Sequence, residues 1–239
     1  MTLSRADDGG SLDRGFWGNI SDPRVRHIYR HGHQRLGVGR KHTEMTRLAC
    51  GDFMAIFDDD DYYGPDYLRF MLGELIERNV SLIKLGSWPQ FVGRWEGAEL
   101  TGNLWQLDIS KTEARMGYGF TYFFSRAAGL APARILEPDK FNWDSQWISK
   151  LQASGYRVAV TNTHPSLLVI KIQHGDNLSR PFSRLLTPLD AKASQVQALL
   201  HPTLPVKILP HSSNNVARRA RHRPRVFRTP LSRGAELPR

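Results

Sequence analysis

The sequence of 239 residues predicts an α/β fold in which a mostly parallel sheet is flanked by helices. Five apolar residues at 53–57 are typical of a short strand that is buried on both faces. Apolar residues at helical spacing then predict a helix at 65–78, and residues 80–85 predict a second apolar strand. This strand–helix–strand order favours parallel strands that are joined by a crossover helix.

The other elements are expected in chain order around this unit. Residues 1–23 are rich in Gly, Asp and Ser, which is typical of a loop. Residues 86–119 have no clear period and are expected to form an extended region with irregular strands. Further strands are expected at 25–29, 119–124, 156–160 and 167–172, and further helices at 41–50, 143–153 and 189–200.

The composition fits a globular body and contains no membrane signal. Hydrophobic residues make up 40% of the chain, and no run approaches the roughly 20 apolar residues that a membrane-spanning helix needs. The N-terminus lacks the apolar core of a signal peptide. The single cysteine, Cys50, cannot form an internal disulfide and is expected to be a small core residue on a helix. A cytoplasmic location is therefore the expectation.

Four consecutive aspartates, Asp58 to Asp61, follow the first apolar strand. Their carboxylates would repel one another unless a cation lies among them. Side chains alternate along an extended chain, so Asp58 and Asp60 are expected on one face and Asp59 and Asp61 on the other. One such pair can chelate a hard divalent ion at the carboxyl end of a strand, where open α/β sheets bind ligands. The alternative is a solvated acidic turn.

Four segments in order resemble the motifs of a known enzyme family. They are residues 7–13 (DDGGSLD), 37–42 (GVGRKH), 51–61 (GDFMAIFDDDD) and 144–158 (DSQWISKLQASGYRV). Together they resemble glycosyltransferase family 2, over about residues 6–179. The resemblance implies a GT-A fold, which is Rossmann-like, and the transfer of a sugar from a nucleoside diphosphate sugar to an acceptor hydroxyl, with inversion.

The resemblance implies a nucleotide-sugar site built from several of these segments. Asp7 would contact the nucleotide base, and Asp8 and Asp59 are also candidates for contact with the nucleotide sugar. Arg40 and Lys41 would lie near the nucleotide, where cations suit a diphosphate. The alternative for Arg40 and Lys41 is an exposed basic helix start.

The resemblance also implies a metal site and a general base. Asp58 and Asp60 would bridge Mg²⁺ or Mn²⁺ to the diphosphate. His174 would approach the metal or the diphosphate, with packing in a loop as its alternative. Asp144, in the first turn of the helix at 143–153, would deprotonate the acceptor hydroxyl. The alternative for Asp144 is a plain acidic residue at a helix start.

The chain departs from the family pattern at three places. Trp143 stands where the family usually has Glu, and His42 stands where it often has Asn. The family also opens with a strand, a helix and a second strand before its acidic turn, and about 30 such residues are missing here. The chain is therefore expected to be N-terminally truncated, and the neighbours of the missing strand are expected to expose apolar edges.

These features suggest three parts and several functions. Residues 1–182 are expected to form a partial glycosyltransferase-like GT-A domain, residues 183–206 a helical extension, and residues 207–239 a disordered tail. The acceptor would be a glycan, a lipid or a protein. The alternatives are a catalytically inactive truncated remnant, a metal-dependent phosphoryl hydrolase and a non-enzymatic basic binding protein.

Most of the net charge of +10 lies in the tail. Residues 207–239 contain eight Arg and one Lys against one Glu. Such a segment is expected to be disordered, without a specific nucleic-acid partner. A weak contact with an anionic membrane surface, at the inner membrane face, is a further candidate role.

Removal of residues 212–239 is expected to leave the fold intact, because this segment is dense in Arg and has no apolar period. Thermal unfolding of the full chain and of the shortened chain would check this. A fall in melting temperature of more than a few degrees would show that the tail packs on the body.

Overall fold

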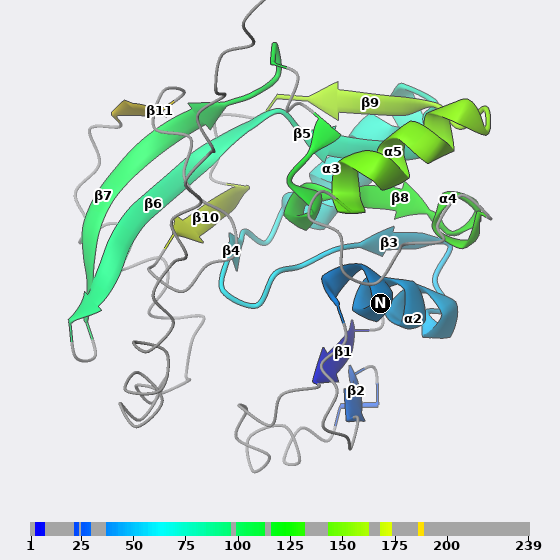
Figure 1. Ribbon diagram of the computed structural model, residues 1–239, viewed down its shortest axis with the longest axis horizontal. Helices are drawn as coiled ribbons and strands as arrows, with labels where there is room; N and C mark the ends of the chain where they lie inside the picture. Colours follow the sequence, from blue (N-terminus) through cyan, green and yellow to red (C-terminus); the bar gives the residue numbers. More distant parts are fainter. Residues whose placement is uncertain are drawn as a thin grey trace, which may run out of the picture.

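The computed structural model describes residues 3–7, 22–23, 25–29, 37–96, 99–112, 116–131, 143–162, 168–173 and 186–188. The helices in these ranges are α2 (Val38–Leu48), α3 (Tyr67–Glu77), α4 (Arg126–Leu130) and α5 (Trp143–Ala153), with a 3₁₀ turn, η2, at Gly119–Thr121. The described strands form three sheets, of two, five and four strands (Figure 1).

The four-stranded sheet has the order β3-β8-β5-β9. Its strands are β3 (Phe53–Ala55), β8 (Phe123–Ser125), β5 (Leu82–Leu85) and β9 (Val158–Thr161). Side chains alternate along β5: Ile83 and Leu85 belong to the core cluster that includes α3, whereas Leu82 belongs to the cluster that includes α5. The two helices therefore cover opposite faces of this sheet, as in an α/β fold.

The five-stranded sheet has the order β11-β7-β6-β10-β4. Its strands are β11 (Leu186–Pro188), β7 (Glu99–Asp108), β6 (Ser87–Glu96), β10 (Val169–Gln173) and β4 (Tyr62–Tyr63). A long hairpin of β6 and β7 supplies most of the sheet (Figure 1). β10 runs parallel to β6 and antiparallel to β4, and every residue of β10 is buried.

The two-stranded sheet pairs β1 (Leu3–Asp7) with β2 (Val25–Tyr29) in parallel. The expectation of a loop throughout 1–23 is therefore wrong at β1. In the described sheets β3 is an edge strand, and its Phe53 is 41% exposed. None of the described helices has the length and apolarity that are needed to cross a bilayer.

The expectation of a mostly parallel sheet is wrong, because the described sheets are mixed. Only β1–β2, β5–β9 and β6–β10 pair in parallel among the described strands. The strand β8 lies between β3 and β5 and is antiparallel to both. Residues 86–119, which were expected to be irregular, mainly form the β6–β7 hairpin. An apolar run predicts a strand, but it does not specify which other strand pairs with it, or in which direction.

The helix boundaries agree closely with the sequence. α5 covers 143–153 as expected, and α3 lies within the expected range of 65–78. Asn79, with φ of 49°, stops α3 in the left-handed region. α2 begins earlier than expected and ends at Leu48, so Cys50 lies beyond the helix and is exposed rather than in the core. The expected helix at 189–200 and the tail at 207–239 fall outside the described residues.

Candidate functional site

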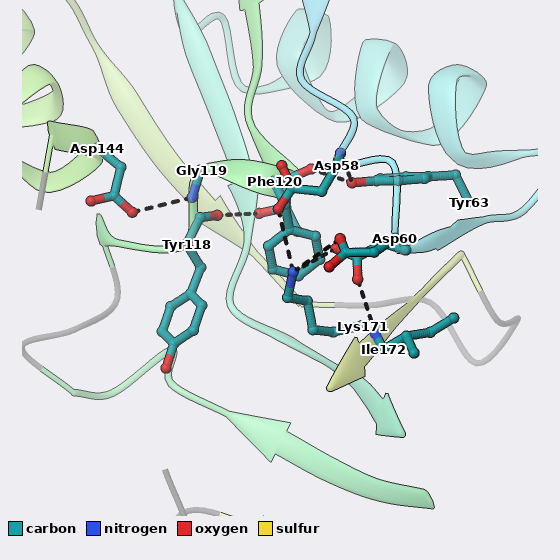
Figure 2. Close-up of polar contacts among 11 residues, drawn as sticks. Asp58, Asp60, Tyr63, Tyr118, Gly119, Phe120, Asp144, Lys171 and Ile172 are labelled. Carbon is teal, nitrogen blue, oxygen red and sulfur yellow. Dashed lines mark hydrogen bonds and ion pairs between the residues drawn. The ribbon is translucent and has the colours of Figure 1, made fainter. Parts of the chain in front are cut away.

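The acidic residues lie in a tight turn that leaves β3. The Asp61 N–H lies 3.4 Å from the Asp58 carbonyl oxygen, which folds the chain back on itself. The Tyr63 hydroxyl accepts a hydrogen bond from the Asp58 N–H at 3.0 Å and donates one to the Phe120 carbonyl at 3.0 Å. Tyr63 therefore fixes this turn to the segment that carries Phe120 (Figure 2).

Lys171 of β10 supplies a cation to this turn. Its Nζ lies 2.9 Å from Asp61 Oδ2, 3.3 Å from Asp58 Oδ2 and 3.9 Å from Asp60 Oδ1. The Lys171 side chain is only 7% exposed, and its Nζ lies 4.9 Å from the centroid of the Phe120 ring (Figure 2). The mutual repulsion of the aspartates is thus offset by a lysine of the same chain.

Asp61 is the most deeply buried of these carboxylates, with no exposed side-chain area. Its Oδ2 accepts a hydrogen bond from Lys171 Nζ, and its Oδ1 accepts one from the Ile172 N–H at 2.9 Å. Burial raises the pKa of Asp61 above its usual value, and the charge of Lys171 acts in the opposite direction. The same carboxylates hold the pKa of Lys171 above its usual value despite burial, so the ammonium stays charged at neutral pH.

The expected division of the aspartates into two faces is wrong. Asp58, Asp60 and Asp61 each offer a carboxylate oxygen, and these oxygens lie within 4.8 Å of one another. Asp59, in contrast, is exposed. The prediction assumed an extended chain, but the turn rotates Asp61 onto the side of Asp58 and Asp60. Three convergent carboxylates suit a hard ion such as Mg²⁺ or Mn²⁺, so this triad can hold a divalent metal.

A second structural unit is the segment Gly117–Thr121, here called the bridge segment. It carries Phe120, whose carbonyl accepts a hydrogen bond from Tyr63, and Gly119, whose N–H donates to Asp144 Oδ2 at 3.2 Å (Figure 2). Tyr118 has a φ of 65°, which is uncommon for a residue with a side chain. This segment therefore connects the acidic turn with Asp144.

Asp144 lies in the first turn of α5, where the sequence placed it. Its Oδ1 accepts a hydrogen bond from the Ser145 N–H at 2.8 Å, and its Oδ2 accepts the one from Gly119. A Cβ at Gly119 would lie 2.8 Å from the Trp143 ring and 3.4 Å from the Asp144 Cβ. Only glycine therefore fits beside the start of α5 without a shift of Trp143.

The two departures from the family pattern contact each other. His42 of α2 stacks on Trp143 of α5, with ring centroids 4.8 Å apart and an angle of 28° between the planes. The pair joins the start of α5 to the first half of α2. The altered residues thus form one packed contact beside Asp144.

The other residues predicted for the site lie on α2, on β1 or outside the described residues. Arg40 is exposed in the first turn of α2 and lies 3.6 Å from Glu44, and Lys41 follows it half-buried. Asp7 is the last residue of β1. Asp8 and His174 lie outside the described residues.

Sequence reasoning missed both buried lysines. Lys84 has no exposed area in β5, and its Nζ donates a hydrogen bond to the Gly117 carbonyl at the start of the bridge segment. Burial lowers the pKa of Lys84 to about 7, and the charge of Asp144 opposes this shift. Lys84 and Lys171 each interrupt an apolar strand in the sequence, and that interruption was the available signal.

Comparison with known proteins shows similarity in fold. No protein-family model and no curated protein matches the sequence. The structure of S. aureus TarS residues 1–349 in complex with UDP-GlcNAc has a TM-score of 0.50 at 13% identity, and the match covers 74% of this chain and 50% of that one. This chain thus spans about half the length of the TarS chain. It has an α/β fold with mixed sheets that resembles GT-A structures.

Two further structures are less similar in fold. A mycobacterial protein has a TM-score of 0.43 at 17% identity, over 83% of this chain and 63% of that one. HddC from Yersinia pseudotuberculosis has a TM-score of 0.35 at 14% identity, over 72% of this chain and 68% of that one.

The variant Lys84→Met tests the buried charge through the pH dependence of stability. The pKa of Lys84 falls from 10.5 to about 7 on folding, so the unfolded chain binds more protons and wild-type stability decreases as the pH is lowered through this window. As the pH is lowered from 10.5 to about 7, the free energy of unfolding of Lys84→Met should rise relative to that of the wild type by about 1 kcal/mol per pH unit. Below this window the difference between the two proteins should stay constant.

Urea unfolding across this pH range would measure the difference. Lys150→Met, at an exposed position on α5, is the matched control and should follow the wild type. An identical pH dependence in all three proteins would contradict a depressed pKa of Lys84.

Proposed function

We propose that this chain is a glycosyltransferase that transfers a sugar from a nucleoside diphosphate sugar to an acceptor hydroxyl, with a divalent metal and with inversion. The observation that carries the proposal is the convergence of Asp58, Asp60 and Asp61 beyond the carboxyl end of β3, in a fold similar to that of TarS. Open α/β sheets bind ligands at this end of their strands. The presence of UDP-GlcNAc in the TarS structure supports a nucleotide sugar as the donor.

The donor would lie over the acidic turn. Asp58 and Asp60 are 37% and 33% exposed, so both carboxylates can reach a solvent-borne ion. A divalent ion held by these two residues would neutralise charge on the diphosphate and so favour its departure from the sugar. Asp59 is exposed beside them and is a candidate for contact with the sugar or nucleotide.

The nucleotide end of the donor would be bound by residues from the first part of the chain. Arg40 and Lys41, in the first turn of α2, carry the positive charge that suits a phosphate group. Asp7 and Asp8 are the candidates for the nucleotide base, and His174 is a further candidate for the metal or the diphosphate.

Asp144 would act as the general base. It would accept the proton of the acceptor hydroxyl while the acceptor oxygen bonds to the anomeric carbon and the bond from that carbon to the diphosphate breaks. The hydrogen bonds from the Ser145 and Gly119 N–H groups hold the Asp144 carboxylate in place. The hydrogen bond from Gly119 also fixes this base relative to the bridge segment, and therefore relative to the acidic turn.

The variant Asp60→Ala is expected to weaken the Mn²⁺-dependent binding of UDP-GlcNAc about ten- to a hundredfold, because a metal ligand is lost. Isothermal titration calorimetry with and without Mn²⁺ would measure this. Asp66→Asn is the matched control, since Asp66 is an exposed carboxylate of the same region, 63% exposed, with its side chain directed to Arg69. Unchanged binding in Asp60→Ala would remove Asp60 from the metal site.

The variant Asp144→Asn is expected to lower transfer about 10²–10⁴-fold while donor affinity stays near that of the wild type. Asparagine keeps one acceptor oxygen for the start of α5 but cannot take up the acceptor's proton. A radiolabelled transfer assay, combined with donor titration, would separate the two effects. Near-normal turnover would exclude Asp144 as the base.

The product of turnover separates this function from its alternatives. Sugar transfer releases UDP from UDP-GlcNAc, whereas phosphoryl hydrolysis of the diphosphate would release UMP and N-acetylglucosamine 1-phosphate. Formation of UMP and N-acetylglucosamine 1-phosphate without UDP would contradict the proposal.

A further inference from the structure

The acidic site already contains a cation that belongs to the protein. Lys171 Nζ lies within 3.9 Å of all three carboxylates of the triad, and its side chain is 7% exposed. Any divalent ion at this site must therefore share its ligands with an ammonium group.

Lys171 is held firmly in place. It lies on β10, which pairs with β6 on one side and with β4 on the other. Its Nζ is also 4.9 Å from the Phe120 ring centroid, on the side of the bridge segment. A buried strand residue with this many contacts cannot move away as a surface lysine can.

Both carboxylate oxygens of Asp61 already accept hydrogen bonds from the protein. Lys171 Nζ donates to its Oδ2 and the Ile172 N–H donates to its Oδ1, each at 2.9 Å. Its side chain has no exposed area, whereas those of Asp58 and Asp60 are about one-third exposed. A metal that arrives from solvent would therefore meet Asp58 and Asp60, while Asp61 stays paired with Lys171.

We propose that Lys171 is a resident cation of the acidic site, which competes with a divalent metal for Asp58 and Asp60 and so keeps the metal affinity of the free protein low. This inference deepens the proposed function and rests on its metal site. The ammonium group lies 3.3 Å from Asp58 Oδ2, so its charge repels an ion that is bound to the same carboxylate. Lys171 thereby determines how strongly the site holds a metal before a phosphate-bearing donor arrives.

The experiment compares Mn²⁺ binding by the wild type and Lys171→Met, measured by electron paramagnetic resonance without nucleotide. Methionine keeps the apolar stem and removes the charge. Lys171→Met is expected to bind Mn²⁺ at least about tenfold more tightly. Lys150→Met, at an exposed lysine of α5, is the matched control and should bind as the wild type does. Equal or weaker binding by Lys171→Met, or no binding by either protein, would overturn the inference.

A second variant covers the case in which Lys171→Met does not fold. Lys171→Met with Asp61→Asn removes both members of the buried pair, one positive and one negative, so the net charge of the cluster stays the same. Asparagine can still accept the hydrogen bond from the Ile172 N–H. Tighter Mn²⁺ binding by this double variant would show that the position of the ammonium, rather than total charge, opposes the metal. Affinity equal to that of the wild type would overturn the inference.

The result is separable from the transferase proposal, because the Mn²⁺ titration uses no donor. If UDP-GlcNAc fails to bind while Lys171→Met gains Mn²⁺ affinity, the transferase proposal fails and the role of Lys171 stands. If the donor binds with Mn²⁺ and Lys171→Met shows no gain, the role of Lys171 fails alone.

Discussion

The ion cluster between Lys171 and the aspartates of the acidic turn is the contact on which the arrangement of the site depends. The turn belongs to the chain that leaves β3 in the four-stranded sheet, whereas Lys171 belongs to β10 in the five-stranded sheet. The hydrogen bond from the Ile172 N–H to Asp61 reinforces this junction. Loss of one partner from a buried ion pair typically costs about 3–5 kcal/mol. The same residues therefore join the two sheets and define the charge of the site.

The bridge segment extends this junction to the start of α5. The carbonyl of Phe120 accepts from Tyr63, which also accepts from Asp58, and Gly119 donates to Asp144. At the start of the segment, Lys84 Nζ donates a hydrogen bond to the Gly117 carbonyl. A shift of this segment would therefore move the acidic turn and Asp144 together. Tyr118 in this segment has a φ of 65°, a conformation that costs free energy for a residue with a side chain.

Much of the local structure and part of the site follow from the sequence. The apolar period predicted α3, because side chains three and four positions apart share one face of a helix, and residues typical of helix ends predicted α5. The run of aspartates after an apolar strand predicted an acidic site, because repulsion between neighbouring carboxylates is also a local property. The mixed sheets did not follow, because β8 enters between β3 and β5 from a segment distant in the chain, and nothing in those short strands specifies their neighbour.

The sequence by itself determined that the charges of Asp58 to Asp61 need a cation nearby, and that Asp144 lies in the first turn of a helix. Only the tertiary structure decided that a cation comes from Lys171, 110 positions from Asp61 along the chain. It also decided that Asp61 rather than Asp59 joins Asp58 and Asp60, because the turn at the exit of β3 replaces the extended chain that the alternation rule assumes. Repulsion among neighbouring carboxylates is a local property, whereas the identity of the group that neutralises them depends on which strands meet.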